Sequence, residues 1–196
     1  MESIIRDNIV THFKINTLFT NRQFGFIKGR STTLLDTWTE YLEQGGQFDV
    51  IYTDLEKAFD KIPHKRLRLI HKLHSYGLHA DIIKWIESFL TYRKQRVRIK
   101  DAFSEWAAVT SGMPQGSILG PMLFIIYIND LVDYCNSGSE MFLFADDAKI
   151  FSYVKHKDGK QLQQDLDKFK EWMDMWLLSL NAGKCRSIVG RRSDST

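Results

Sequence analysis

The sequence of 196 residues predicts an α+β fold, in which amphipathic helices accompany a small antiparallel sheet. Helices are indicated by apolar residues that recur with the helical period, as they do in residues 2–14. A strand is indicated over residues 48–54, where alternate residues share one face and Asp54 ends it. A β-hairpin is indicated over residues 141–151, because two short apolar segments flank a pair of acids.

Most other elements are bounded by residues that typically start or end helices. Ser31 is a suitable N-cap for a helix that ends before Gly45, and Pro63 and Gly77 bound the next helix. A second hairpin is expected from strands at residues 95–100 and 105–110, and a last short strand around Ile188. The expected helices together cover residues 2–14, 31–43, 63–77, 81–92, 117–131 and 158–178.

The composition indicates a folded domain, or one lobe of a larger protein, in a reducing compartment. Hydrophobic residues make up 43% of the chain and aromatic residues 13%, which is enough to bury a sizeable core. Cys135 and Cys185 are isolated and form no disulfide framework. The first residues lack the pattern of a signal peptide, and the longest apolar run is too short to span a bilayer, so no membrane partner is expected.

Asp146 and Asp147 are the only adjacent acids in the chain, and they fall where the hairpin must turn. Two carboxylates about 4 Å apart at a protein surface repel each other by about 1–4 kcal/mol. A divalent cation removes this cost, and magnesium prefers carboxylate oxygens. The alternative is an ordinary polar turn, because aspartate is common in turns.

A third carboxylate favours the metal interpretation. Asp54 ends an otherwise apolar face of its strand, and antiparallel pairing can bring it beside the hairpin although the two are far apart in sequence. Three carboxylates suit two magnesium ions about 3.5–4 Å apart, which activate an attacking oxygen and stabilise a leaving one. That arrangement is typical of phosphoryl transfer, which depends mainly on positioning and charge neutralisation.

A cluster of basic residues lies in the first strand of the second hairpin, whereas the net charge of the whole chain is only +3. Alternation places Arg96, Arg98 and Lys100 on one face, opposite Val97 and Ile99. Such a face can follow a phosphate backbone, or it can simply be solvated. The complete cluster consists of Arg93, Lys94, Arg96, Arg98 and Lys100.

A loop over residues 111–121 is punctuated by glycine and proline. Gly112, Gly116 and Gly120 are spaced four apart, and the loop lacks the ending of a Walker phosphate-binding motif. The glycines either permit tight turns and close helix packing, or let a nucleotide approach the backbone. Both interpretations stay open at this point.

Five short motifs follow one another in the order typical of one enzyme family. They are residues 23–26 with 29–31, residues 52–60, residues 111–121, residues 144–147, and Leu180–Asn181 with Lys184. Over about residues 1–190 the chain resembles the reverse transcriptase domain of non-LTR (LINE-type) retrotransposons. The order of all five motifs makes this resemblance specific.

The resemblance implies a right-hand polymerase fold, here a fingers and palm fragment whose antiparallel palm sheet is backed by helices. Residues 1–45 would be partial fingers, and residues 46–190 the palm with a fingers-like insertion. Residues 191–196 would be a disordered tail, and the thumb would be absent. The upstream fingers and the endonuclease of the retrotransposon polyprotein are expected as partners but are absent from this sequence.

The resemblance also implies roles for individual residues. Asp54 and Asp146 would bridge two magnesium ions, with Asp147 assisting and manganese as a possible substitute. The 3′-hydroxyl of a DNA primer, paired to an RNA template, would attack the α-phosphate of a dNTP. Lys184 would give a proton to the leaving pyrophosphate. The residues expected to bind the dNTP are Lys28, Arg30, Phe59, Gln115 and Gly116, with Phe59 under the sugar.

Two other functions fit the same residues. An RNA-dependent RNA polymerase would share the metal carboxylates, but such enzymes typically carry an aspartate where this chain has Phe59. The other alternative is an inactive element fragment that only binds nucleic acid. The resemblance implies an intracellular location, in nucleus and cytoplasm as a ribonucleoprotein.

Overall fold

The computed structural model describes residues 1–27, 29, 30, 39, 43, 47–62, 68–153 and 160–190. Contacts divide the chain into two compact units. We call Met1–Leu18 with Lys57–Tyr127 the helical unit, and Phe19–Glu56 with Ile128–Thr196 the sheet unit. The α+β class is confirmed. The helix expected over residues 31–43, apart from Thr39 and Glu43, lies outside the described residues, as do Lys28 and residues 191–196.

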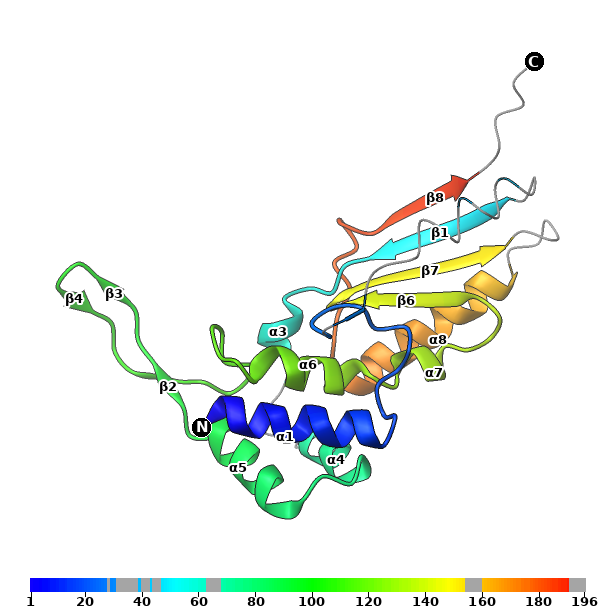
Figure 1. Cartoon of the computed structure of the whole chain (residues 1–196). Coiled ribbons are helices and arrows are strands. Elements are labelled where there is room, and N and C mark those ends of the chain that lie inside the picture. Colours follow the sequence, from blue (N-terminus) through cyan, green and yellow to red (C-terminus); the bar gives the residue numbers. More distant parts are fainter. Residues whose placement is uncertain are drawn as a thin grey trace. The chain divides into compact units, whose positions relative to one another are not determined.

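The sheet unit is built on four antiparallel strands in the order β6-β7-β1-β8, seen edge to edge in Figure 1. The predicted hairpin is confirmed as β6 and β7, and the predicted strand before Asp54 is confirmed as β1. The four strands are β1 (Phe48–Thr53), β6 (Glu140–Phe144), β7 (Asp147–Tyr153) and β8 (Arg186–Gly190).

The strand register decides which side chains share a face of this sheet. Tyr52 of β1 pairs with Lys149 of β7 on one side and with Arg186 of β8 on the other. Because directly paired residues point to the same face, these three side chains lie in a row. Further along that face, buried aromatic and aliphatic side chains form a core cluster of Phe48, Val50, Phe142 and Phe151.

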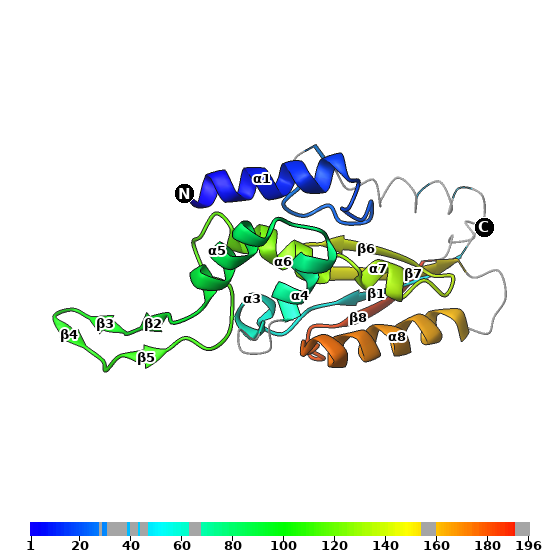
Figure 2. The same cartoon turned by 90° about the horizontal axis from the view of Figure 1, so that it is seen from below.

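Two helices complete the described part of the sheet unit, α7 (Leu131–Tyr134) and α8 (Lys160–Trp176). Figure 2 shows α8 running along the sheet, and it contacts both β7 and α7. It buries Phe169 and Met173 as its apolar period predicts, and also Trp172. Asp165, although an acid, is fully buried, and its side-chain oxygens accept the backbone N–H groups of residues 137 and 139 at 2.8 Å.

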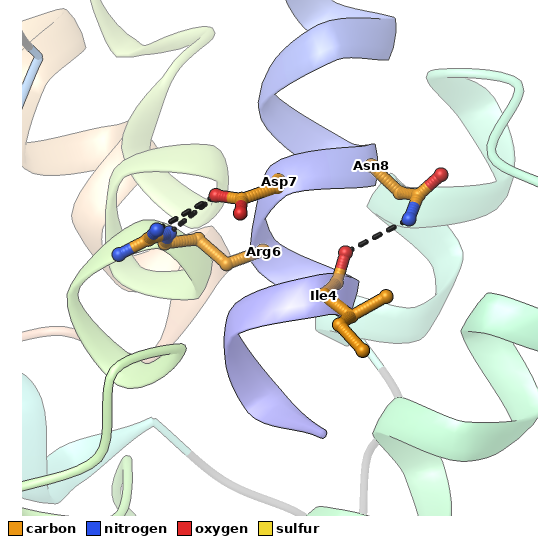
Figure 3. A network of polar contacts seen from close by, with 4 residues as sticks. All are labelled: Ile4, Arg6, Asp7 and Asn8. Atoms are coloured by element: carbon orange, nitrogen blue, oxygen red, sulfur yellow. Dashed lines mark hydrogen bonds and ion pairs between the residues drawn. The ribbon is translucent and has the colours of Figure 1, made fainter.

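The helical unit contains five helices in its described residues. The first, α1, begins and ends within one residue of the predicted range, and its Ile9 and Phe13 are fully buried. Its exposed side carries local polar contacts, in which Arg6 pairs with Asp7 and Asn8 donates to the backbone carbonyl of Ile4 (Figure 3). The helices are α1 (Glu2–Ile15), α3 (Ala58–Lys61), α4 (Arg68–Ser75), α5 (Ala80–Leu90) and α6 (Gly120–Ile128).

The helix expected over residues 117–131 is shorter and divided. It begins at Gly120, because the Ser117 hydroxyl accepts the backbone N–H of Gly120 at 2.9 Å. The Glu2 carboxylate accepts the N–H of Ile118 at 2.9 Å, and an anion is favourable at a helix N-terminus. α6 ends at Ile128, and α7 follows as a separate helix after a short turn.

A long hairpin, here named the basic arm (residues 93–109), extends from the helices of this unit in Figure 1. The predicted hairpin is confirmed, but its strands are interrupted where longer strands were expected. β2 (Lys94–Gln95) pairs with β5 (Ala107–Ala108), and β3 (Arg98–Ile99) pairs with β4 (Ala102–Phe103). Every residue of these four short strands is exposed.

No helix among the residues that the structure describes has both the length and the apolar character needed to cross a membrane.

Candidate active site

The turn between β6 and β7 presents the paired acids. Phe144 pairs with Asp147, so Ala145 and Asp146 alone form the turn. Ala145 has φ of 56°, the left-handed region that a tight hairpin turn normally gives to glycine. A residue with a Cβ adopts this conformation at a cost of about 1–2 kcal/mol. The turn is therefore strained at the point where it carries the predicted metal ligands.

Asp54 stands at the same edge of the sheet. It follows Thr53, the last paired residue of β1, whose partner on β7 is Ala148. The Thr53 hydroxyl also donates to the Ala148 carbonyl at 3.0 Å. The backbone carbonyl of Asp54 accepts the N–H of Asn181 at 2.8 Å, which anchors the segment before β8 beside it. The structure thus brings together Asp54, Asp147 and Lys184 from three distant parts of the sequence.

These residues line a cavity of about 360 Å³. Lys184 Nζ lies 3.4 Å from both carboxylate oxygens of Asp54. Besides Thr53 and Ala148, three further lining residues were missed from the sequence, namely Tyr52, Lys149 and Arg186. Each is two positions from a predicted site residue on the same strand or segment, so the alternation of a strand could have identified them once the register was known.

Charge and burial both act on Asp147. Although the residue as a whole is exposed, partial burial of its carboxyl group raises the pKa, the nearby charges of Asp146 and Asp54 raise it further, and Lys149 and Lys184 lower it. Mutual repulsion between carboxylates is what the sequence predicted at this turn. Burial also raises the pKa of Tyr52, whose ring lies 5.3 Å from Lys149 Nζ.

The donors suit a hard divalent cation, since they are carboxylates that repel one another. Asp54 and Asp147 line the cavity, whereas Asp146 does not. Among the described residues, no three histidine, cysteine, aspartate or glutamate side chains are gathered closely enough to hold a metal ion. The three-carboxylate metal site therefore stays a prediction, which the pair of Asp54 and Asp147 supports through its chemistry.

Arg30, expected near the triphosphate, is engaged within its own loop. Its guanidinium donates to the backbone carbonyls of Thr20 and Gln23, the latter at 2.9 Å, and to the Asn21 side chain at 3.4 Å. Its role in dNTP binding stays a prediction, as does that of Lys28.

In the helical unit, the second and third motifs are joined by backbone hydrogen bonds. Met113 N–H donates to the Phe59 carbonyl at 2.6 Å, and Gly112 N–H donates to the Ile62 carbonyl at 2.8 Å. Gly112 has φ of 85°, and a Cβ there would lie 2.9 Å from Asp60 Cα. Gly112 therefore serves a tight turn and close packing, which was one of the two interpretations of the loop.

The predicted dNTP-binding residues of this unit have partners of their own. The Phe59 ring is half-buried and stacks on Phe124 at 4.4 Å between centroids. Gln115 is exposed and donates from Nε2 to Asp60 Oδ1 at 3.0 Å. Gly116 is exposed with φ of 78° and has open space around its Cα. Their contacts with a nucleotide stay predictions.

The basic arm carries aromatic rings among its cations, a feature that the charge pattern of the sequence did not indicate. The Arg96 guanidinium lies 4.0 Å from the ring centroid of Phe103 and 4.6 Å from that of Trp106. Both rings remain at least half exposed. Val97 and Ile99 are exposed as well, so neither face of the arm is buried within the described residues.

Comparison with known proteins identifies the family. The family model for reverse transcriptase (RNA-dependent DNA polymerase) matches residues 1–193. The chain belongs to the reverse transcriptase family. It is 30% identical over 204 residues to the RNA-directed DNA polymerase from mobile element jockey of Drosophila funebris, covering 96% of this chain and 22% of that protein. It is 28% identical over 197 residues to the probable RNA-directed DNA polymerase from transposon X-element of Drosophila melanogaster, covering 95% and 21%.

The chain thus spans about a fifth of the length of these relatives. Among solved structures, apo telomerase from Candida tropicalis, truncated from its C-terminal domain, superposes with a TM-score of 0.71 at 15% identity. The match covers 98% of this chain and 41% of that one. It confirms the fold expected for a fingers and palm fragment of a right-hand polymerase.

Proposed function

We propose that this reverse transcriptase domain is the polymerase core of a non-LTR retrotransposon. It transfers a nucleotidyl group from a dNTP to the 3′-hydroxyl of a DNA primer on an RNA template. The observation that carries the proposal is the cavity that joins Asp54, Asp147 and Lys184 at one edge of the sheet. Membership of the family and the names of the relatives support the same reaction.

Asp54, Asp146 and Asp147 would hold two magnesium ions, or manganese in their place. When bound, these ions supply charge neutralisation at the attacking and leaving oxygens. Lys184 is exposed beside Asp54, from where its ammonium can give a proton to the departing pyrophosphate. The protein groups thus position the phosphates and handle the proton, as phosphoryl transfer requires.

The remaining substrate contacts are divided among several parts of the chain. Phe59 would pack under the deoxyribose, Gln115 and Gly116 would lie near the template–nucleotide pair, and Arg30 or Lys28 near the triphosphate. The basic arm would bind the phosphate backbone of template or primer, because its cations are exposed and repeated along a projecting hairpin. One relative of this fold, telomerase from Candida tropicalis, has been solved in complex with a fragment of telomeric RNA.

The partners of the complete protein would be an RNA template, a DNA primer and further segments of the polyprotein, including upstream fingers, a thumb and an endonuclease. Its location would be intracellular, in nucleus and cytoplasm as a ribonucleoprotein.

Primer extension tests the proposal. The chain, and a longer natural chain extended at both ends, are incubated with a DNA-primed RNA template, dNTPs and Mg²⁺. Asp54→Asn and Asp146→Asn are expected to abolish extension while primer–template binding, measured by fluorescence anisotropy, is unchanged. Asp133→Asn, at an exposed acid on α7, is the matched control and should extend normally. Extension at the wild-type rate by Asp146→Asn would refute the assignment of Asp146 as a metal ligand. If the chain and the longer chain both bind the primer–template tightly and neither extends it, the alternative of a fragment that only binds nucleic acid is favoured.

A further inference from the structure

A segment of the first motif runs beside the strand that leads into the strained turn. Gln23 forms a parallel bridge with Leu143 of β6, in which Leu143 N–H donates to the Arg22 carbonyl at 2.8 Å and Phe24 N–H donates to the Leu143 carbonyl at 2.9 Å. Arg22 also pairs with Glu140 at the start of β6, at 2.6 Å. The segment is therefore fixed to β6 at Leu143 by backbone hydrogen bonds and at Glu140 by an ion pair.

Gln23 is a fully buried polar residue, and its side chain is bonded to the turn itself. Its Oε1 accepts the backbone N–H of Ala145 at 3.0 Å and that of Gly25 at 2.8 Å. Its Nε2 donates to the backbone carbonyl of Ala145 at 3.4 Å. One carboxamide thus binds both backbone polar groups of Ala145, which requires a side chain with both an acceptor and a donor.

Ala145, to which Gln23 is hydrogen-bonded, is the residue in the left-handed conformation. Ala145 is buried, so its N–H and carbonyl would lose hydrogen-bond partners if Gln23 were apolar. Strain of this kind persists only where surrounding contacts hold it in place. Gly25 shows how tightly the segment is packed there, since a Cβ on it would lie 2.3 Å from the backbone nitrogen of Ala145.

Arg30 supports Gln23 from the other side. Its guanidinium donates to the backbone carbonyls of Thr20 and Gln23, which holds the loop that carries the carboxamide. A continuous set of hydrogen bonds therefore runs from Arg30 through Gln23 to Ala145. The next two residues are Asp146 and Asp147.

We propose that Gln23 is a positioning residue for the metal-binding turn. By binding the N–H and the carbonyl of Ala145, it keeps the turn left-handed and so presents the carboxylates of Asp146 and Asp147 for divalent cations. The inference rests on the proposed function of those carboxylates. It assigns the fingers motif around Gln23 a role in the geometry of the palm site, in addition to any contact with substrate.

Measurement of Mn²⁺ affinity distinguishes a positioning role of Gln23 from a purely structural one. Mn²⁺ affinity is measured by electron paramagnetic resonance on the full chain, without nucleic acid or dNTP. Gln23→Met, which keeps the length of the side chain and removes its three hydrogen bonds, two to Ala145 and one to Gly25, is expected to weaken Mn²⁺ binding at least tenfold. Gln23→Glu keeps the acceptor and loses the donor, so it should show a smaller loss and provides the measurement if Gln23→Met does not fold.

Asp165→Asn is the matched control, because Asp165 is another fully buried polar residue of the sheet unit that binds two backbone N–H groups. It should lower the melting temperature without changing Mn²⁺ affinity in the folded protein. Ala145→Gly, which accepts a positive φ without steric cost, should recover part of the affinity that Gln23→Met removes.

Equal Mn²⁺ affinity in wild type and Gln23→Met would overturn the inference and leave the proposed function standing. A loss in Asp165→Asn as large as that in Gln23→Met would also overturn it, because general destabilisation would then explain both. If Gln23→Met weakens Mn²⁺ binding although no chain extends a primer, the inference holds and the proposed polymerase activity fails.

Discussion

The ammonium of Lys184 lies 3.4 Å from each carboxylate oxygen of Asp54, although 130 residues separate them in sequence. Without bound metal, Lys184 is thus a counter-ion of a predicted metal ligand. Two-thirds of the Lys184 side chain is exposed, so the ion pair is weak and a divalent cation can replace it. Lys184 would then be free to act on the leaving group.

Removing this ammonium group should therefore change the metal affinity and the extension rate in opposite directions. Lys184→Met is expected to tighten Mn²⁺ binding by roughly two- to fivefold, the range of an exposed ion pair. Its extension rate should nevertheless fall at least tenfold if Lys184 is the proton donor, as proposed. Single-turnover extension and Mn²⁺ titration give the two values. Lys170→Met, on α8, removes an equally exposed cation and should change neither. Full extension by Lys184→Met would exclude Lys184 as the donor.

Asp147→Asn should stabilise the metal-free protein at neutral pH. The pKa of Asp147 is raised in the folded state by burial and by Asp146 and Asp54, so ionisation of Asp147 disfavours folding. The free energy of unfolding of the wild type therefore decreases as the pH rises from 3.8, the ordinary pKa of an aspartate, through the raised pKa of folded Asp147. Below pH 3.8 this decrease is absent. The variant should be more stable than wild type at pH 7 and equal to it near pH 3.

Urea unfolding at a series of pH values, in the presence of a chelator, measures this difference. Asp167→Asn, at an exposed acid on α8, serves as the control and should show no such pH-dependent gain. A gain that is equally large at pH 3 and pH 7 would mean that charge repulsion is not its cause.

Neutralising the basic arm should weaken nucleic-acid binding regardless of sequence. The affinity for nucleic acid falls as salt rises, so the slope of log affinity against log salt is negative. If Arg96, Arg98 and Lys100 bind phosphates, their replacement by glutamine should make this slope shallower by about 0.7–0.9 for each phosphate that is no longer neutralised. Anisotropy titrations with unrelated primer–template sequences provide the slope. The control replaces three other exposed cations, Lys14, Lys84 and Lys170. A slope equal to the control's would show that the arm is only solvated.

Phe59→Val should relax selection against ribonucleotides. Phe59 follows Asp54 by five residues, and a phenyl ring under the sugar fills the space of a 2′-hydroxyl without offering it a hydrogen bond. The variant is expected to keep dNTP use and to gain at least tenfold in ribonucleotide incorporation, which corresponds to about 1.4 kcal/mol. Incorporation of single nucleotides by a chain that extends primers provides the measurement.

The same change also removes a stacking interaction, since the Phe59 ring packs on Phe124. Phe89→Val is therefore the control, because Phe89 is a half-buried aromatic stacked on Trp85 in the same unit. It should lose stability and leave sugar selection unchanged. If wild type already uses both sugars equally, Phe59 is a packing residue and the RNA polymerase alternative gains support.

Local sequence was sufficient for the fold class, the strand before Asp54, the hairpin that carries Asp146 and Asp147, and the family. These features depend on side-chain periodicity and on short motifs, which are properties of neighbouring residues. Helix ends were less predictable. Residues 117–119 were expected in a helix, but α6 begins at Gly120 where the distant Glu2 and the nearby Ser117 satisfy backbone N–H groups.

Only the tertiary structure decided the neighbours of the acids. The pairing of β1 with β7 and β8 places Lys149, Arg186 and Lys184 around the cavity of Asp54, and no local pattern specifies which strands pair or in what register. The sequence likewise indicated Gln23 only as part of a motif. Its burial and its hydrogen bonds to Ala145 arise because a loop packs against a strand more than a hundred residues away in the sequence. A buried carboxamide forms hydrogen bonds with the polar groups that lie next to it, and only the tertiary structure determines which groups those are.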